Sequence, residues 1–405
     1  MANKDKYLNN KFIKTNNAML KNSKLKKIKS LMYYVDRNLN IFIHKPKRGL
    51  KDKQRVLIVF NLALGDGVVF LCALKDIRKL YPRNKYLLDI TCQKGLESIY
   101  IKTGLFDNVI PENFTKGTLD IKERYKIIKD LNKNYYDLVL DPVGANECFT
   151  NVLMTRNIKA KQRIGAIMSN TPCICPKHIL NKTYTSLKTI KTTSLIEQYF
   201  EFFYDKYEVK YCDLPKEKNI LDLPKDYFIV FPSASTELKR WPIDRYAEIV
   251  RRIYRKTKLP LVICGTQGDR ASFNELVELI KDDNIPIVDI IGKTNLLTFF
   301  DIIAKAKLVI TNDTSTYHIA VISETPVAIV TGGYTYDRYV LYDFKDNNKY
   351  RKPYPIVYKM NCFNCMNNCS IINKGDRTWP CLNKITVDYA WKVIEKMIDK
   401  EVNLK

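Results

Sequence analysis

Residues 308–320, LVITNDTSTYHIA, combine an apolar run with side chains that could bind an anion. The run ends in the polar residues Asp313, Thr314, Ser315 and Thr316, and a helical pattern that contains His318 follows directly. Free N–H groups at a helix start bind anions, helped by the positive end of the helix dipole and here by three small hydroxyls. The stretch therefore predicts a phosphate site. An ordinary capped helix with a packed histidine is the alternative, because Asp, Ser and Thr are common N-caps.

A second polar stretch, PSASTELKRWP at residues 232–242, also lies between an apolar run and a helical pattern. It offers the hydroxyl of Ser235, exposed amides and the cations Lys239 and Arg240, which together suit a pyrophosphate or a departing phosphate. Pro242 marks the helix start, since proline is favoured at the first helical position. A solvated basic turn is the alternative.

A third stretch, NLALGDG at residues 61–67, contains Gly65, Asp66 and Gly67. We expect a loop there, in which the two glycines let the backbone approach a ligand, before a helix that starts at Val68. Asp66 suits a general base, because a carboxyl group with a pKa near 3.9 is ionised at neutral pH. A carboxylate that only caps the helix is the alternative.

The same turn also resembles a dinucleotide fingerprint, in which Asp89 would contact a ribose. The third glycine of that fingerprint is Phe70 here, and the charge of Asp66 would repel a pyrophosphate. An NAD(P)-dependent oxidoreductase is therefore the second choice of enzyme.

The elements expected around these stretches alternate between strand and helix. Strands are predicted at 56–60, 86–91 and 138–141, then at 227–231, 260–264, 287–291, 308–312 and 326–330. Helices are predicted at 68–81, 120–131, 242–256, 271–281 and 296–306. This is the pattern of an α/β protein with two parallel sheets, which bind ligands at the carboxyl ends of their strands. We assign an extension (1–54), an N-terminal domain (55–210), a linker (211–226) and a C-terminal domain (227–405).

Four separated motifs together resemble glycosyltransferase family 9, the ADP-heptose:lipopolysaccharide heptosyltransferase family. They are NLALGD at 61–66, KRWP at 239–242, GKT at 292–294 and NDT-x-x-x-H at 312–318. The resemblance implies a GT-B fold, with two Rossmann-like domains facing across a cleft. It also implies an inverting transfer from a nucleotide-sugar, ADP-heptose, to a lipid-linked oligosaccharide.

The resemblance also implies roles for individual residues. Asp66 would be the catalytic base, and Ser235 and Lys239 would contact the donor diphosphate. Thr314 and its neighbours would supply helix-start amides, and Asp269 would contact the ribose. Ser315 stands where the family has glycine, which would restrict the backbone. No Asp-x-Asp pair occurs, so neither a metal at the diphosphate nor another cofactor is expected.

The chain contains 11 cysteines, an odd number that does not suit a secreted disulfide framework and favours a reducing cytoplasm. Four of them, Cys362, Cys365, Cys369 and Cys381, have the spacing C-x2-C-x3-C-x11-C. This spacing is compatible with a structural zinc site. An iron–sulfur cluster or simply packed, reduced thiols are the alternatives.

The net charge is +25, and the first 54 residues hold 15 Lys and Arg against 3 Asp and Glu. Apolar residues at 25, 28, 31, 32 and 35 follow a helical spacing among lysines, as in a basic helix that lies on an anionic membrane. A solvated helix that packs on the main body is the alternative. Nucleic acid ranks last as a partner, because no nucleic-acid-binding motif accompanies the charge. We expect a cytoplasmic protein, peripheral at the inner face of the inner membrane. The non-enzyme alternative is a basic nucleotide- or membrane-binding protein that has lost catalysis.

Overall fold

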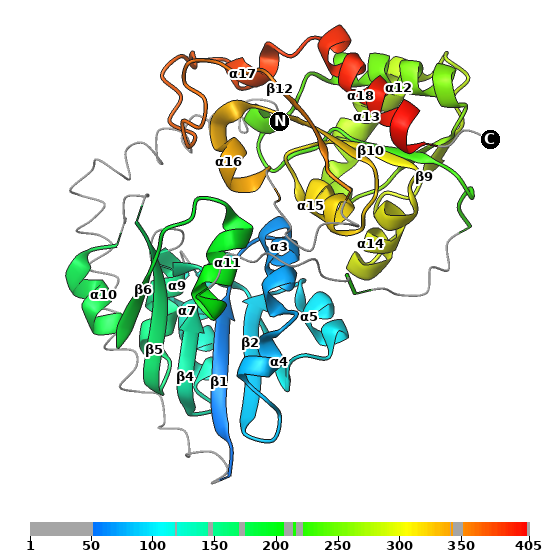
Figure 1. Ribbon diagram of the computed structural model, residues 1–405. Helices are drawn as coiled ribbons and strands as arrows, with labels where there is room; N and C mark the ends of the chain where they lie inside the picture. Colours follow the sequence, from blue (N-terminus) through cyan, green and yellow to red (C-terminus); the bar gives the residue numbers. More distant parts are fainter. Residues whose placement is uncertain are drawn as a thin grey trace. The chain divides into compact units, whose positions relative to one another are not determined.

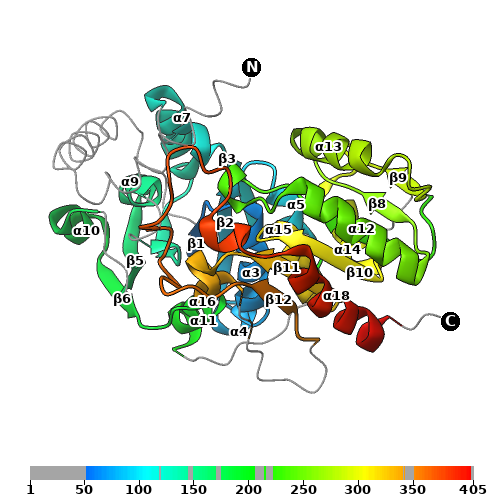
Figure 2. The ribbon, with the colours of Figure 1, turned by 90° about the horizontal axis from the view of Figure 1, so that it is seen from above.

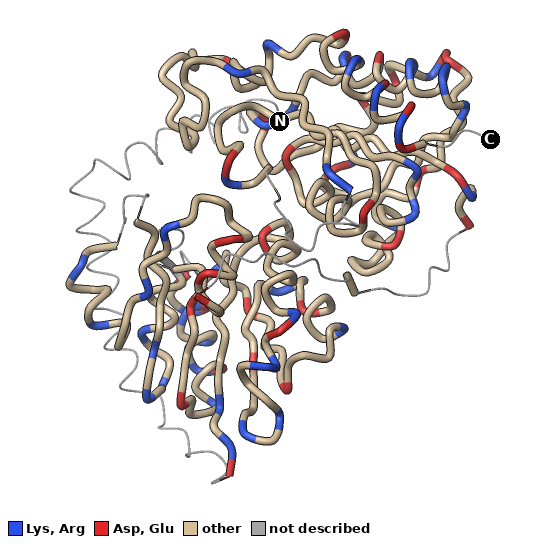
Figure 3. The backbone as a smooth tube through the Cα atoms, viewed as in Figure 1, with Lys and Arg blue, Asp and Glu red and all other residues tan. Residues whose placement is uncertain are grey.

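The computed structural model describes residues 52–117, 120–144, 149–169, 175–205, 214–215, 222–340, 342 and 351–402. The chain divides at residues 209 and 210 into two compact units. We call the described residues 52–205 the N-terminal unit and the described residues 214–402 the C-terminal unit. Almost all of the predicted basic extension, and most of the predicted linker, lie outside the described residues. In the described parts, Lys and Arg are interspersed with Asp and Glu in both units (Figure 3).

The N-terminal unit is built on a parallel sheet of six strands in the order β3-β2-β1-β4-β5-β6. The strands are β1 (Gln54–Phe60), β2 (Tyr86–Gln93), β3 (Asn108–Glu112), β4 (Tyr136–Asp141), β5 (Ala160–Met168) and β6 (Ser186–Ile190). β1 pairs with both β2 and β4, so that Val56 lies beside Leu88 and Leu138. The chain builds the sheet outward in opposite directions from β1 and β4, and such a switch point opens a ligand crevice at the strands' carboxyl ends.

Helices cover both faces of this sheet (Figure 1). They are α3 (Leu64–Leu74), α4 (Ile77–Leu80), α5 (Glu97–Thr103), α6 (Phe114–Gly117), α7 (Ile121–Leu131), α9 (Phe149–Asn157), α10 (Lys177–Thr183) and α11 (Leu195–Tyr204). α11 packs against α3. The rings of Phe60 and Phe70 stack with centroids 4.1 Å apart, and Tyr199 meets Phe70 edge-on at 5.0 Å. This aromatic cluster fixes the start of α3 against the end of β1.

The C-terminal unit repeats the same topology, with six parallel strands in the order β12-β11-β10-β7-β8-β9. The strands are β7 (Phe228–Phe231), β8 (Leu261–Ile263), β9 (Ile287–Asp289), β10 (Leu308–Asn312), β11 (Val327–Thr331) and β12 (Tyr354–Val357). Every residue of β7, β10 and β11 is buried, as expected for strands covered on both faces. The switch point of this sheet lies between β7 and β10.

Helices again lie on both faces of the C-terminal sheet. The helical segments are η2 (Glu237–Lys239), α12 (Ile243–Thr257), η3 (Gln267–Asp269), α13 (Arg270–Ile280), α14 (Leu296–Lys305), α15 (Ser315–Ile322), η4 (Gly333–Thr335), α16 (Tyr336–Tyr339), α17 (Pro380–Asn383) and α18 (Val387–Glu401). α12 packs against both α13 and α18, whereas α14 packs against α15 on the opposite face (Figures 1 and 2).

The structure confirms the predicted strands and the α/β class and corrects the start of one helix. α3 begins at Leu64 rather than at Val68, so Gly65, Asp66 and Gly67 belong to its first turn and not to a loop. The predicted helix to residue 81 is interrupted after Leu74, and the short α4 follows. In the described part of the chain, no helix is long and apolar enough to cross a membrane.

Candidate functional site

Asp66 lies at the switch point of the N-terminal sheet, in the first turn of α3 and just beyond the end of β1. Asp66 is only partly buried, whereas every later residue of α3 is buried. The helix starts early because the amide of Gly67 already donates to the carbonyl of Ala63 over 2.9 Å. The partly exposed start of an otherwise buried helix thus places one carboxylate at the carboxyl end of β1, where parallel sheets bind ligands.

Gly67 packs closely against a neighbouring side chain, while an approach of its backbone to a ligand stays a prediction. A Cβ atom at this position would lie 3.1 Å from the hydroxyl oxygen of Tyr100, which comes from α5. Burial raises the pKa of Tyr100 well above its ordinary value, and the charges of Cys92 and Asp66 act in the same direction. Asp66 is therefore close enough to the Tyr100 hydroxyl to act on it electrostatically.

The carboxyl end of β4, beside β1 at the same switch point, carries a second carboxylate that the sequence analysis did not single out. Asp141 is fully buried and accepts hydrogen bonds from the amide of Gly144 at 3.0 Å, from the hydroxyl of Tyr184 at 2.5 Å and from Asn151. Burial raises the pKa of Asp141 to about 6, although these hydrogen bonds oppose the shift. Its position, an acidic residue that ends an apolar strand, was the signal that could have drawn attention to it.

Asp89, the ribose ligand of the alternative dinucleotide reading, lies in the middle of β2 and is fully buried. Asn108 donates to its carboxylate at 2.8 Å, and Nε of Arg55 lies 3.5 Å from it. This carboxylate therefore ties β2 to β3 and β1 inside the sheet. It does not lie at the carboxyl end of the strand, where a ribose contact would be needed.

In the C-terminal unit, two of the predicted donor-binding side chains meet at the switch point. Nζ of Lys239, at the end of η2, lies 2.9 Å from Oδ2 of Asp313, which follows β10. Lys239 also lies 5.5 Å from the centre of the Tyr334 ring. Burial acts to raise the pKa of Asp313, but Lys239 and, when its ring is protonated, His318 outweigh burial and lower that pKa. Asp313 is therefore a buried carboxylate that holds a partly exposed cation.

Asn312 locks the two loops of this site together. Its side-chain oxygen accepts from the amide of Trp241 at 3.2 Å and from the hydroxyl of Tyr246 at 2.9 Å, while its amide group donates to the carbonyl of Pro232 at 2.7 Å. Trp241 is itself buried and donates to the carbonyl of Ile385 at 3.0 Å. The loop after β7 is thus bonded directly to the last residue of β10.

His318 is buried in the first half of α15, and its Nδ1 contacts the hydroxyl of Tyr342. Burial lowers the pKa of His318 to about 4, against the opposing charge of Asp313. The ring is therefore neutral at pH 7. The structure thus shows a packed histidine that has a partner, while its contact with a donor stays a prediction.

The hydroxyl residues differ in how well they are placed for a ligand. Ser235 is exposed, and Thr314 is partly exposed at the N-cap of α15, with its Oγ1 3.2 Å from that of Thr311. Ser315 is the first residue of α15, and its φ angle is not positive. A serine in place of the family's glycine therefore strains no backbone here. The hydroxyl of Thr316 is buried and, within the described residues, makes no hydrogen bond.

Asp269 has a structural role in the loop after β8. One carboxylate oxygen accepts from the hydroxyl of Ser233 at 2.6 Å, and the other accepts from the amide of Thr266 at 2.9 Å and from its hydroxyl at 2.7 Å. Both oxygens are thus engaged in fixing the loops that follow β7 and β8. A contact of Asp269 with a ribose stays a prediction.

A groove of about 700 Å³ opens elsewhere in the C-terminal unit, lined by the start of α12 and by residues from 371 to 384. Three basic side chains line it, Arg240, Arg377 and Lys384, and so do four acidic ones, Glu237, Asp244, Glu275 and Asp376. Arg240 belongs to the same loop as Lys239, but neither Lys239 nor Asp313 lines this groove.

The comparisons with known proteins decide the family. The family model for glycosyltransferase family 9 (heptosyltransferase) matches residues 124–338, more than half of the chain. The chain belongs to glycosyltransferase family 9. Lipopolysaccharide heptosyltransferase 3 of Escherichia coli is 25% identical over 232 residues, which cover 53% of this chain and 64% of that protein. The match thus spans slightly less than two thirds of this relative.

Solved structures assign this family 9 chain to the GT-B fold. The glycosyltransferase of family 9 from Veillonella parvula has a TM-score of 0.66 and 17% identity, and the match covers 87% of this chain and all of that one. The E. coli heptosyltransferase WaaC, solved with ADP-2-deoxy-2-fluoro heptose, has a TM-score of 0.57 and 17% identity over 85% of this chain and 99% of that one. The two six-stranded parallel sheets of the chain agree with this fold.

Proposed function

We propose that this family 9 chain transfers a heptose or a closely related sugar from an ADP-linked donor to a hydroxyl of a lipopolysaccharide core oligosaccharide. The transfer inverts the configuration of the anomeric carbon. The observation that carries the proposal is the pairing of Lys239 with Asp313 at the switch point of the C-terminal sheet. Membership of the family and the relative named for heptose transfer support the choice of sugar.

Asp66 is the proposed catalytic base. Its partial exposure at the carboxyl end of β1, in the first turn of a buried helix, suits a carboxylate that must reach an acceptor hydroxyl. As the acceptor oxygen forms its bond to the anomeric carbon, its proton passes to Asp66. The bond from that carbon to the donor diphosphate breaks on the opposite side, which is why the configuration inverts.

Lys239 and the start of α15 are proposed to stabilise the departing diphosphate. A lysine ammonium carries three hydrogens, so the bond to Asp313 leaves two for phosphate oxygens. The amides at the start of α15, where the Thr314 side chain makes no capping hydrogen bond, complete the anion site together with Ser235 and Thr314. Charge that develops on the diphosphate therefore meets fixed donors that need no reorganisation.

The proposal also includes the identity of the donor and a contact with the membrane. The WaaC structure was solved with an ADP-linked heptose analogue, which supports an ADP-sugar donor for a chain of the same fold. The basic segment 1–54 is proposed to hold the protein at the anionic inner face of the inner membrane, where a lipid-linked acceptor is presented.

The decisive experiment supplies the purified full chain with ADP-heptose and a lipopolysaccharide core acceptor that lacks its outer sugars. We expect the acceptor to gain the mass of one heptose and ADP to be released in equal amount. UDP-glucose serves as the mismatched donor. Transfer from UDP-glucose in place of ADP-heptose would reject the donor assignment, and no transfer from a panel of nucleotide-sugars would reject the enzyme assignment.

An assay with NAD(P)H distinguishes the proposed glycosyltransferase from the second enzyme class. An NAD(P)-dependent oxidoreductase would change the absorbance of NAD(P)H, whereas we expect no such change because Asp89 is enclosed in the sheet. A mass-spectrometric comparison of lipopolysaccharide from cells with and without the protein then identifies the sugar and the position in the core.

A further inference from the structure

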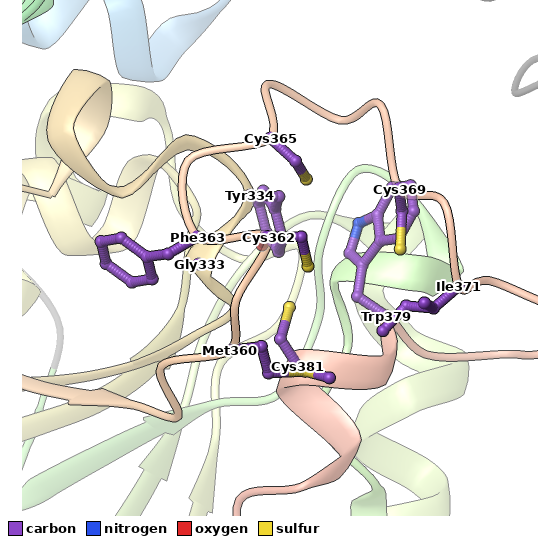
Figure 4. A pocket seen from close by; sticks show the side chains of 10 residues that line it. All are labelled: Gly333, Tyr334, Met360, Cys362, Phe363, Cys365, Cys369, Ile371, Trp379 and Cys381. Carbon is purple, nitrogen blue, oxygen red and sulfur yellow. The ribbon is translucent and has the colours of Figure 1, made fainter.

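Four cysteines near the C-terminus surround one small cavity. Cys362, Cys365, Cys369 and Cys381 line a small, partly open space of about 10 Å³ together with aromatic and apolar residues. All four are free thiols, and all are partly buried. Figure 4 shows the four sulfur atoms turned toward the same space, from the loop that holds the first three cysteines and from α17. The spacing C-x2-C-x3-C-x11-C thus becomes a cluster in three dimensions.

The segment that carries three of these thiols contributes no buried residue to the core. No residue from 361 to 378 is buried, and none belongs to a helix or a strand. Met366 and Ile371 expose 43% and 44% of their surfaces. The segment is therefore held by surface contacts, such as that of the Phe363 ring with Tyr336 at a centroid distance of 5.2 Å, and its backbone has positive φ at Asn364, Met366 and Asn367.

Backbone amides already point at two of the sulfur atoms. The amide of Asn367 donates to Cys365, and the amides of Gly333 and Leu382 donate to Cys381. Amide donors to sulfur are the outer contacts that a thiolate metal site needs.

We propose that Cys362, Cys365, Cys369 and Cys381 together bind one tetrahedral transition-metal ion, zinc or iron, at a structural site. Four thiolates select zinc or iron and reject Mg²⁺, Ca²⁺ and Mn²⁺, which prefer oxygen. All four positions are filled by protein, so no position is open for chemistry. Within the described residues, no group of three or more His, Cys, Asp or Glu side chains is placed to hold a metal ion as the side chains stand. Binding would therefore require the four thiols to converge by side-chain rotation as their protons leave.

A bound ion would also stabilise residues next to the proposed donor site, because the cysteine loop contacts Gly333 and Tyr334. The amide of Asn364 donates to the carbonyl of Gly333 at 2.6 Å, and the amide of Met366 donates to the carbonyl of Tyr334 at 2.7 Å. Gly333 must lack a side chain, because a Cβ atom would lie 2.5 Å from the ring of Phe363. The cysteine loop is thus pressed against Tyr334, whose ring lies next to Lys239.

The test measures the metal content of the purified full chain by plasma mass spectrometry, after expression in zinc-supplemented and in iron-supplemented medium. We expect one ion per chain in at least one preparation, without acid-labile sulfide. Cys365→Ser and Cys369→Ser should each reduce this content severalfold. Cys72→Ala is the matched control, because it removes a buried thiol of the other unit and should leave the content unchanged.

A second readout does not depend on how the variants fold. Zinc or iron released from the wild-type chain by a mercurial reagent should be replaced by Co²⁺, which gives the intense visible absorption of a tetrahedral thiolate complex. Only trace metal in wild-type protein from both media would overturn the proposal. So would acid-labile sulfide, which indicates an iron–sulfur cluster, or a metal content that is equal in the wild type and in both serine variants.

Discussion

Nζ of Lys239 lies 2.9 Å from Oδ2 of Asp313, so the cation proposed to meet the donor diphosphate is itself held by a buried carboxylate. The two residues are 74 positions apart in the chain and come together because β7 and β10 are neighbours in the sheet. Lys239 is therefore positioned before a donor binds. Removal of either residue should affect both the donor site and the stability of the C-terminal unit.

Lys239→Ala should weaken donor binding and destabilise the C-terminal unit. One charge-assisted hydrogen bond is worth about 1.5–3 kcal/mol, so the Kd for the ADP-sugar should rise roughly 10- to 150-fold. Asp313 would lose its partner, which should lower the free energy of unfolding by about 1–3 kcal/mol. The loss should lie toward the lower end of this range because Lys239 is partly exposed to solvent. Calorimetric titration and thermal unfolding measure the two effects.

The double variant Lys239→Ala/Asp313→Asn separates these effects. It removes the stranded charge, so it should regain stability relative to Lys239→Ala without regaining donor affinity. If the double variant bound the donor as tightly as the wild-type protein, the pair would be purely structural.

Asp66→Asn should abolish transfer and leave the fold and the donor affinity nearly unchanged. Loss of a general base costs about 10²–10⁴-fold in rate. The matched control is Asp76→Asn, a carboxylate in the same unit that pairs with the exposed Lys79. Turnover of the Asp66 variant close to that of the wild type would remove this residue from the mechanism.

Added Mg²⁺ or Mn²⁺ should not increase the transfer rate of protein that has been desalted in the presence of EDTA. The proposed charge stabilisation comes from Lys239 and the amides at the start of α15, and the sequence contains no Asp-x-Asp pair for a chelated metal. Initial rates with and without each metal check this. Strict dependence on either metal would contradict the proposed stabilisation of the diphosphate.

The stability of the C-terminal unit should fall as the pH is lowered from about 6.5 to about 4. Burial holds the pKa of His318 at about 4, whereas an unfolded histidine has a pKa near 6.5. The unfolded chain therefore binds more protons in this window, which favours unfolding by up to about 3 kcal/mol. Urea unfolding at several pH values should show this slope in the wild type.

His318→Gln should flatten this pH dependence, because glutamine does not titrate. His178→Gln, at an exposed position of α10, should leave the slope unchanged. An equal slope in the wild type and in the His318 variant would assign the pH dependence to other groups.

Deletion of residues 1–50 should reduce binding to anionic liposomes while donor hydrolysis in solution is retained. This segment carries most of the +12 charge of the first 54 residues, and each Lys or Arg near an anionic leaflet contributes about 1 kcal/mol, screened by salt. Sedimentation with liposomes at low and high salt measures the effect. Equal binding by the truncated chain would leave the segment without a role at the membrane.

The sequence by itself determined the candidate loops and the strands and helices that flank them, whereas β3, β5, β6 and β12 were not predicted. β7, β10 and β11 are continuous apolar runs because both faces of the strands are covered, and such runs can be recognised without neighbours. By contrast, β5 was missed because its first half is polar and exposed. The start of α3 was also misplaced, because its glycine-containing first turn looks like a loop when only local propensity is considered.

The tertiary structure decided which side chains of the candidate loops meet. Lys239 and Asp313 form a pair, Asp269 turns inward to Ser233, and Gly67 makes room for Tyr100. The buried network around Asp141 likewise depends on β4 lying beside β5 and on Tyr184, 43 residues further along the chain. Hydrophobic periodicity depends on neighbours within a few residues. Ion pairs and close approaches depend instead on the order of strands in a sheet, and no local pattern in this chain encodes that order.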